Sequence, residues 1–80
     1  MRWLFKKSRI IGDIIEYLYS FESDDLDGII TYDKREKTIS INKPCKNDKD
    51  SKWCIERTTG KFYTYIVQKD FPEEKAVITG

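Results

Sequence analysis

The clearest pattern of apolar and polar positions lies in residues 9–20, RIIGDIIEYLYS. At about 100° per residue, the apolar side chains of this segment fall on one arc of a helix and the polar ones on the other. Ser8 precedes the segment and offers a hydroxyl that can cap the first turn. The pattern therefore predicts an N-terminal amphipathic helix over 9–20. Residues 1–7 are predicted as a separate strand or irregular arm, because a longer helix would place Lys7 in the apolar arc.

Two segments further along the chain show the alternation of a half-buried strand, residues 28–33 and residues 37–42. A four-residue loop between them would pair Tyr32 with Ile39. This register keeps the alternate apolar residues of both strands on one face, whereas a three-residue loop would separate them. The pattern predicts an antiparallel hairpin.

The rest of the chain is predicted as a loop, a second hairpin and a last strand. Residues 43–52 are polar and contain a proline, which is typical of a surface loop. Residues 52–57 and 61–69 carry aromatic and β-branched side chains on either side of Thr-Thr-Gly at 58–60. Both a three-residue and a two-residue turn fit, so the register stays open. Residues 75–79 follow as a short strand.

Together these elements predict one small α+β domain over residues 1–80. Its N-terminal helix would pack on an antiparallel meander sheet of about four to five strands. The composition agrees, because eleven isoleucines, five tyrosines and four phenylalanines suit a pleated sheet. A net charge of only +1 is typical of a folded chain rather than a disordered one.

The chain contains no histidine, which removes several chemistries. A Ser–His–Asp or Cys–His couple and His-ligated zinc are excluded, and a hydrolase would need a carboxylate of raised pKa in a deep apolar pocket. Cys45 and Cys54 lack the close spacing of a redox or zinc motif. We therefore expect no enzymatic activity, no cofactor and no metal site, and we expect both cysteines to stay reduced.

Four carboxylates gather in the loop predicted before the first hairpin: Glu22, Asp24, Asp25 and Asp27. A calcium loop is rejected, because Ser23 and Lys34 occupy what would be its first and last ligand positions. The remaining interpretations are a solvated loop or an acidic patch that docks a basic partner.

A second candidate surface combines three aromatic residues with neighbouring cations. The aromatic residues are Trp53, Tyr63 and Tyr65, and the cations are Lys52, Arg57, Lys61 and Lys69. Aromatic rings flanked by cations can stack the bases of single-stranded nucleic acid. The near-zero net charge and the lack of an RNA-recognition signature favour burial or protein contact for these rings instead.

The sequence as a whole predicts a cytoplasmic protein–protein interaction module, for instance an inhibitor or regulator of a basic partner. The acidic loop and the aromatic strand pair would supply the surface, since tyrosine and tryptophan favour interface cores. Binding of single-stranded nucleic acid is the alternative function. No membrane span is expected, because no apolar run approaches the required length. Contact with an anionic membrane surface is not expected either, because the polar face of the predicted N-terminal helix is mainly acidic. The open edges of a small sheet would also admit a second copy of the chain.

Overall fold

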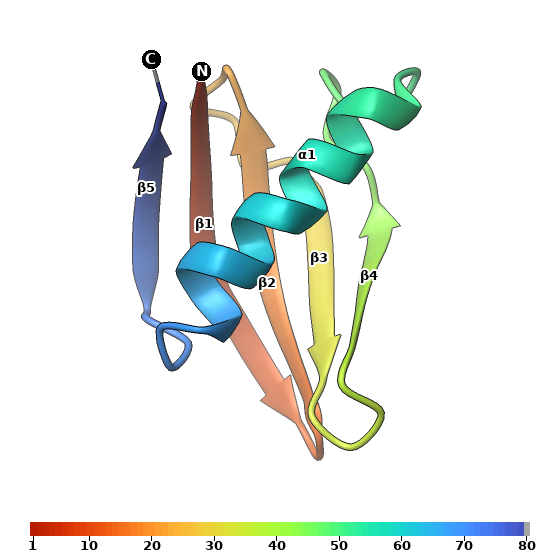
Figure 1. Ribbon diagram of the computed structural model, residues 1–80, viewed down its shortest axis with the longest axis vertical. Coiled ribbons are helices and arrows are strands. Elements are labelled where there is room, and N and C mark those ends of the chain that lie inside the picture. Colours follow the sequence, from red (N-terminus) through yellow and green to blue (C-terminus); the bar gives the residue numbers. More distant parts are fainter. Residues whose placement is uncertain (80) are drawn as a thin grey trace.

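The computed structural model describes residues 1–79, which form a five-stranded antiparallel sheet with one helix across one face (Figure 1). In chain order the elements are β1 (Arg2–Ile11), β2 (Ile14–Phe21), β3 (Gly28–Asp33), β4 (Thr38–Lys43), α1 (Lys52–Phe62), its π-helical continuation η1 (Tyr63–Val67) and β5 (Glu74–Ile78). The predicted α+β class is confirmed. The predicted position of the helix is wrong, because the helix follows the first four strands instead of preceding them.

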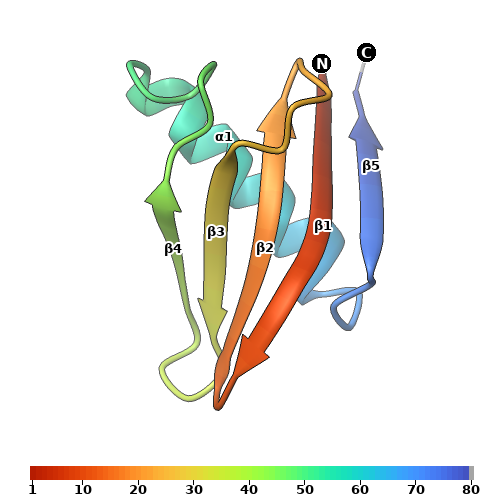
Figure 2. The ribbon, with the colours of Figure 1, turned by 180° about the vertical axis from the view of Figure 1, so that it is seen from behind.

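The sheet is a meander that is completed by the last strand. β1 to β4 follow one another, and β5 returns after the helix to pair with β1, which gives the order β4-β3-β2-β1-β5. The segment predicted as a strand or irregular arm, residues 1–7, therefore belongs to an internal strand. Both ends of the described chain lie side by side (Figure 2). The Met1 amino group donates to the Thr79 carbonyl at 2.6 Å, and the Thr79 amide donates to the Met1 carbonyl at 2.8 Å.

The prediction of a helix over residues 9–20 is wrong, since these residues form the end of β1, a two-residue turn and most of β2. Gly12 occupies the first turn position with a φ of +57°, which glycine adopts without the steric cost of a side chain. Strand pairing on both sides of the turn directs Tyr17 into the core and leaves Ile10 and Ile11 58% and 55% exposed. The apolar positions of two consecutive strands thus also fit the periodicity of an amphipathic helix.

The prediction of a hairpin over residues 52–69 is also wrong, since this segment forms α1 and η1. Ser51 caps the helix, and its hydroxyl accepts a hydrogen bond from the Cys54 amide at 3.2 Å. The residues that pack toward the sheet recur at every fourth position: Cys54, Thr58, Phe62 and Ile66. The predicted turn at 58–60 lies inside the helix. Its residues have modest helix propensity, and burial against the sheet overrides that preference.

The hairpin predicted from residues 28–33 and 37–42 is confirmed. β3 and β4 pair Tyr32 with Ile39 and Ile30 with Ile41, as the alternation predicts. The loop between them ends at Lys37, whose φ is +57°. The predicted last strand is confirmed as β5, which begins one residue earlier at Glu74.

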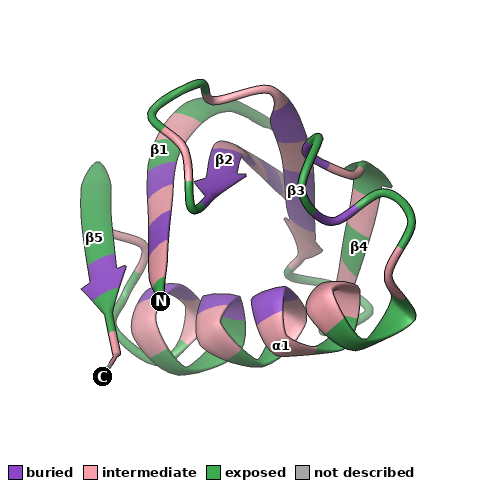
Figure 3. Cartoon of the chain, turned by 90° about the horizontal axis from the view of Figure 1, so that it is seen from above, coloured by how far each residue is buried: buried purple, intermediate pink, exposed green. Residues whose placement is uncertain are grey.

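The hydrophobic core fills the space between the sheet and α1, where buried segments of both face each other (Figure 3). Phe62 lies at its centre, with ring centroids 5.5 Å from Phe5 and 5.3 Å from Tyr17. Gly28 lets the Tyr19 ring lie directly on the backbone, because a Cβ at this position would be 2.7 Å from Tyr19 Cζ. The core is therefore closely packed and mostly aromatic.

The polar loop after β4, predicted to lie on the surface, sends Cys45 and Asp48 into the core, where both are fully buried. Asp48 Oδ2 accepts hydrogen bonds from the Thr58 hydroxyl at 2.7 Å and the Tyr19 hydroxyl at 3.0 Å. The Thr58 hydroxyl accepts from Trp3 Nε1 at 2.8 Å, and the Tyr19 hydroxyl accepts from the Cys45 amide at 3.0 Å. We call these five residues the buried network. It ties the loop and the helix to β1 and β2.

Candidate functional site

One flank of the helix carries aromatic and cationic side chains at every fourth residue, a spacing that places them on one face. They are Trp53, Arg57, Lys61 and Tyr65, and Lys75 of β5 joins them; we call this set the basic–aromatic surface. The Arg57 guanidinium lies 4.6 Å from the centroid of the Trp53 ring. The ammonium groups of Lys61 and Lys75 each lie 6.0 Å from the Tyr65 ring. These distances are within the range of cation–π attraction, so the rings hold the cations near the surface.

Trp3 supports this surface from below. Its ring centroid lies 6.0 Å from the Arg57 guanidinium and 5.6 Å from Lys61 Nζ. Trp3 is itself buried and held by the hydrogen bond from its indole nitrogen to Thr58. The buried network therefore positions the residue on which two of the cations rest.

A shallow hollow of about 400 Å³ opens between these side chains. Its lining consists of Arg57, Gly60, Lys61, Thr64 and Tyr65. The space beside Gly60 is open, because a Cβ built there would have no heavy atom within 4 Å. The hollow is large enough to receive a side chain from a bound molecule.

Within residues 1–79, the cations of this surface are not paired with a carboxylate. None of Arg57, Lys61 and Lys75 forms an ion pair with another residue in 1–79, and only five of the fifteen lysine and arginine side chains do so. These three are distinguished by gathering on one face beside aromatic rings. The Arg57 Nε is also buried without a hydrogen-bond partner from that part of the chain. The surface therefore presents positive charge that no carboxylate of residues 1–79 neutralises.

The four predicted acidic residues do lie together in the loop between β2 and β3, but each of them already contacts Arg2 or Lys46 of the same chain. Asp24 pairs with Arg2 at 2.7 Å, and Glu22 accepts from the Arg2 backbone amide. Asp25 pairs with the Lys46 ammonium at 3.0 Å, and Asp27 accepts from the Lys46 amide at 3.2 Å. These contacts fix the loop and reduce its negative charge.

The three predicted aromatic residues do not share a strand face. Trp53 is 57% exposed and lies with Tyr65 on the basic–aromatic surface. Tyr63, 48% exposed, is two residues from Tyr65 and therefore points to a different side of the helix. Sequence reasoning missed Lys75, which reaches the surface only because β5 pairs with β1.

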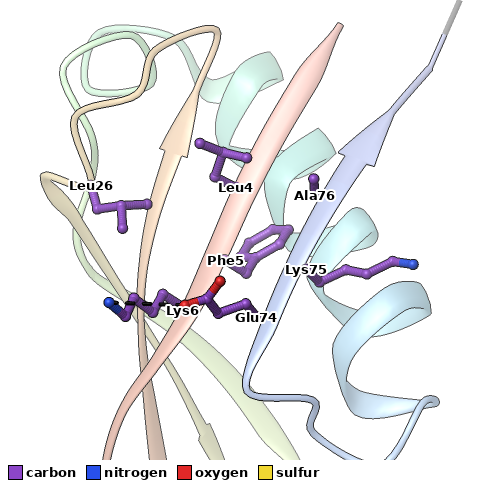
Figure 4. Close-up of a pocket in the computed structure, with 7 residues that line it drawn as sticks. All are labelled: Leu4, Phe5, Lys6, Leu26, Glu74, Lys75 and Ala76. Carbon is purple, nitrogen blue, oxygen red and sulfur yellow. Dashed lines mark ion pairs between the residues drawn. The ribbon is translucent and has the colours of Figure 1, made fainter.

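A second hollow, of about 350 Å³, lies beside β1 and β5 (Figure 4). Leu4, Leu26 and Ala76 provide its apolar lining, and an ion pair between Lys6 and Glu74 at 3.9 Å lies at its side. Lys6 and Glu74 are paired with each other, so this hollow offers a small apolar surface beside an ion pair.

The two cysteines are free thiols, Cys45 buried and Cys54 half-buried. Burial raises the pKa of the Cys45 thiol above its ordinary value, which keeps it protonated and unreactive. In residues 1–79 no three His, Cys, Asp or Glu side chains converge to hold a metal ion. Within the same range, no helix is long and apolar enough to cross a membrane.

No protein-family model matches this chain, and neither a curated protein nor a solved structure shows significant similarity to it. Function is therefore inferred from the chain's own surfaces.

Proposed function

We propose that this chain is a protein-interaction module without enzymatic activity, and that its basic–aromatic surface binds an acidic segment of a partner protein. One observation carries the proposal: three cations rest on aromatic rings and lack a carboxylate partner within residues 1–79, namely Arg57, Lys61 and Lys75. Carboxylates from a partner would supply the missing counter-charges.

Arg57 is the central recognition residue in this proposal. A guanidinium is a planar fork that binds a carboxylate through two parallel hydrogen bonds. Cation–π contacts with Trp53 and Trp3 restrain the side chain, so less conformational entropy is lost when a ligand binds. Centrally placed Arg and Trp side chains each contribute about 2 kcal/mol or more in protein interfaces.

Lys61 and Lys75 act on the rim of the surface, on either side of Tyr65. Exposed ion pairs of this kind contribute only about 0–1 kcal/mol each, but they orient an acidic segment along the helix and speed its association. The hollow beside Gly60 would receive a side chain of that segment.

The acidic loop supports a basic partner less well. Arg2 and Lys46 already hold its carboxylates, so a basic partner would have to replace these internal contacts. The free thiols of Cys45 and Cys54 suit a reducing compartment, and we place the protein in the cytoplasm as part of the same proposal.

Binding of single-stranded nucleic acid is a second candidate function for the same surface. The exposed Trp53 ring beside Arg57 favours it, because bases stack on such rings. However, Arg57 covers one face of that ring, and three cations offer a short track for a phosphate backbone. The acidic protein segment is therefore the better-supported partner.

The test is a titration of the whole chain with a short Asp/Glu-rich peptide and, in parallel, with an oligothymidylate. Intrinsic fluorescence reports binding, because Trp53 lies on the surface and Trp3 directly beneath it. Arg57→Gln removes the central cation, and Arg57→Lys keeps the charge but loses the fork. Arg35→Gln is the matched control, since Arg35 is exposed in the loop between β3 and β4.

We expect Arg57→Gln to weaken peptide binding about 30-fold, equivalent to about 2 kcal/mol. Arg57→Lys should give an intermediate loss, and Arg35→Gln should bind like the unmodified chain. Equal losses for the two Arg→Gln variants would refute a localised site. Tighter binding of the oligothymidylate than of the peptide, with a steep dependence on salt, would replace the proposal by the nucleic-acid function.

A further inference from the structure

β4 is an edge strand whose outer side is free within residues 1–79. It pairs with β3 alone, and it stands at the end of the strand order. In an antiparallel pair, every second residue of an edge strand directs its backbone N–H and C=O away from the sheet. β4 therefore presents a row of unused hydrogen-bonding groups along one side of the molecule (Figure 1).

Residues 38–42 of β4 are nearly symmetric about Ser40. If two copies of the strand run antiparallel with Ser40 opposite Ser40, then Thr38 lies opposite Asn42 and Ile39 lies opposite Ile41. Polar residues thus meet polar residues and isoleucine meets isoleucine. Cross-strand pairs of matched character are the unit that stabilises a sheet.

The two edge strands of the sheet, β4 and β5, are not equally protected against pairing with another strand. Thr38 to Asn42 contain no charge, proline or glycine, so this part of β4 lacks the devices that usually block an edge, and only Lys37 and Lys43 flank it with charge. β5 begins with Glu74 and Lys75, and a symmetric pairing about Ala76 would place Glu74 opposite Ile78. β4 is therefore the better edge for pairing with itself.

We infer that a second copy of this chain binds at β4 through antiparallel pairing about a two-fold axis at Ser40. The two sheets then become one continuous sheet, with both helices on the same face. Ile39 and Ile41 are half-buried and pack against the core in one copy. In the pair they form a cluster of four isoleucines that continues the core from one copy into the other.

The charges at the strand ends give the dimer a distinctive response to salt. In the two-fold register, Lys37 of one copy lies beside Lys43 of the other. Screening of this like-charge repulsion should strengthen the dimer as salt is raised. Peptide binding at the basic–aromatic surface should weaken under the same conditions, so the two proposals fail or succeed separately.

The experiment is sedimentation equilibrium of the whole chain at low and high salt, over micromolar to millimolar concentrations. Such a small interface should give a weak, reversible dimer. Ser40→Lys places two positive charges opposite each other on the two-fold axis, while its side chain stays on the exposed outer face. We expect this variant to remain monomeric. Ala76→Lys, at the same kind of exposed position on β5, is the control and should dimerise normally.

Mixing tests the register directly. Ser40→Lys and Ser40→Glu chains should each be monomeric alone and should associate one-to-one when mixed, because opposite charges then face each other. Association of this mixture also shows that both variants are folded. The inference is overturned if the unmodified chain stays monomeric at high salt and millimolar concentration. It is also overturned if Ala76→Lys abolishes the dimer while Ser40→Lys does not.

Discussion

Replacement of Thr58 by valine tests whether the buried network stabilises the fold. Valine has nearly the same shape as threonine, so the change removes a hydroxyl without opening a cavity. Two hydrogen bonds are lost, one to the Asp48 carboxylate at 2.7 Å and one from Trp3 Nε1 at 2.8 Å. Both partners are fully buried, so bulk solvent does not reach them to replace the hydroxyl.

The expected loss is about 3 kcal/mol in the free energy of unfolding. A hydrogen bond to a charged group contributes about 1.5–3 kcal/mol, and an unpaired buried donor costs about 1–3 kcal/mol. Asp48 Oδ1 already lacks a partner within the described chain, so the carboxylate would keep only the Tyr19 hydroxyl on its other oxygen. For a domain whose total stability is about 5–15 kcal/mol, this is a large fraction.

Urea unfolding followed by tryptophan fluorescence measures the effect, with a comparison of free energies at equal slope. Thr59→Val is the matched control, since its hydroxyl donates only to the Ile55 carbonyl one turn earlier, and it should change stability by a few tenths of a kcal/mol. A loss below about 1 kcal/mol for Thr58→Val would show that the network does not stabilise the fold.

Two further results are expected. Gly28→Ala should destabilise the fold by about 1–3 kcal/mol, because the new methyl group meets the Tyr19 ring. Gly60→Ala, whose methyl group meets nothing within 4 Å, should be neutral or stabilising by up to about 1 kcal/mol. Thermal unfolding compares the two variants, and equal melting temperatures would contradict the close packing of Tyr19 on Gly28. Burial raises the pKa of Tyr17 and Tyr19 above the ordinary value of 10.0, so above that pH the folded chain binds more protons than the unfolded chain. The free energy of unfolding should therefore fall as the pH rises from about 10, and urea midpoints that stay constant through this range would refute it.

The predictable part of the fold was the part with one consistent pattern. In residues 28–43, only one register keeps Ile30, Tyr32, Ile39 and Ile41 on the same face, and the structure has that register. In residues 9–20, two strands of alternating residues also satisfied a helical arc. Gly12, followed by an aspartate and flanked by isoleucines, was the local sign of the turn.

The helix was missed because local preference and tertiary need disagree there. Trp53, Ile55 and Tyr65 favour strands, while the spacing of four from Cys54 to Ile66 favours a helix. The aromatic face of the sheet requires a cover, and the longer-range requirement prevails. The local patterns do not decide between helix and strand here, since the outcome depends on packing against strands far away in the sequence.

The candidate site was predictable only in part for the same reason. Trp53 and Tyr65 were identified, with Arg57 and Lys61 as neighbours. Lys75 reaches the surface through the pairing of β5 with β1. The carboxylates of the acidic loop are paired with Arg2 and Lys46, which come from distant segments of the sequence. Residue types indicated candidates, but tertiary contacts decided which charges are free.

The strand order also has a consequence for synthesis of the chain. β1 to β4 are complete at Lys43, before the helix begins at Lys52, so the nascent sheet displays Phe5, Tyr17 and Tyr19 without a cover. β1 obtains its second neighbour only when Glu74–Ile78 emerge. Until α1 covers the sheet and β5 pairs with β1, the nascent chain exposes an aromatic surface and an open strand edge, both of which promote aggregation. Chaperone demand should be greatest while residues 44–78 leave the ribosome.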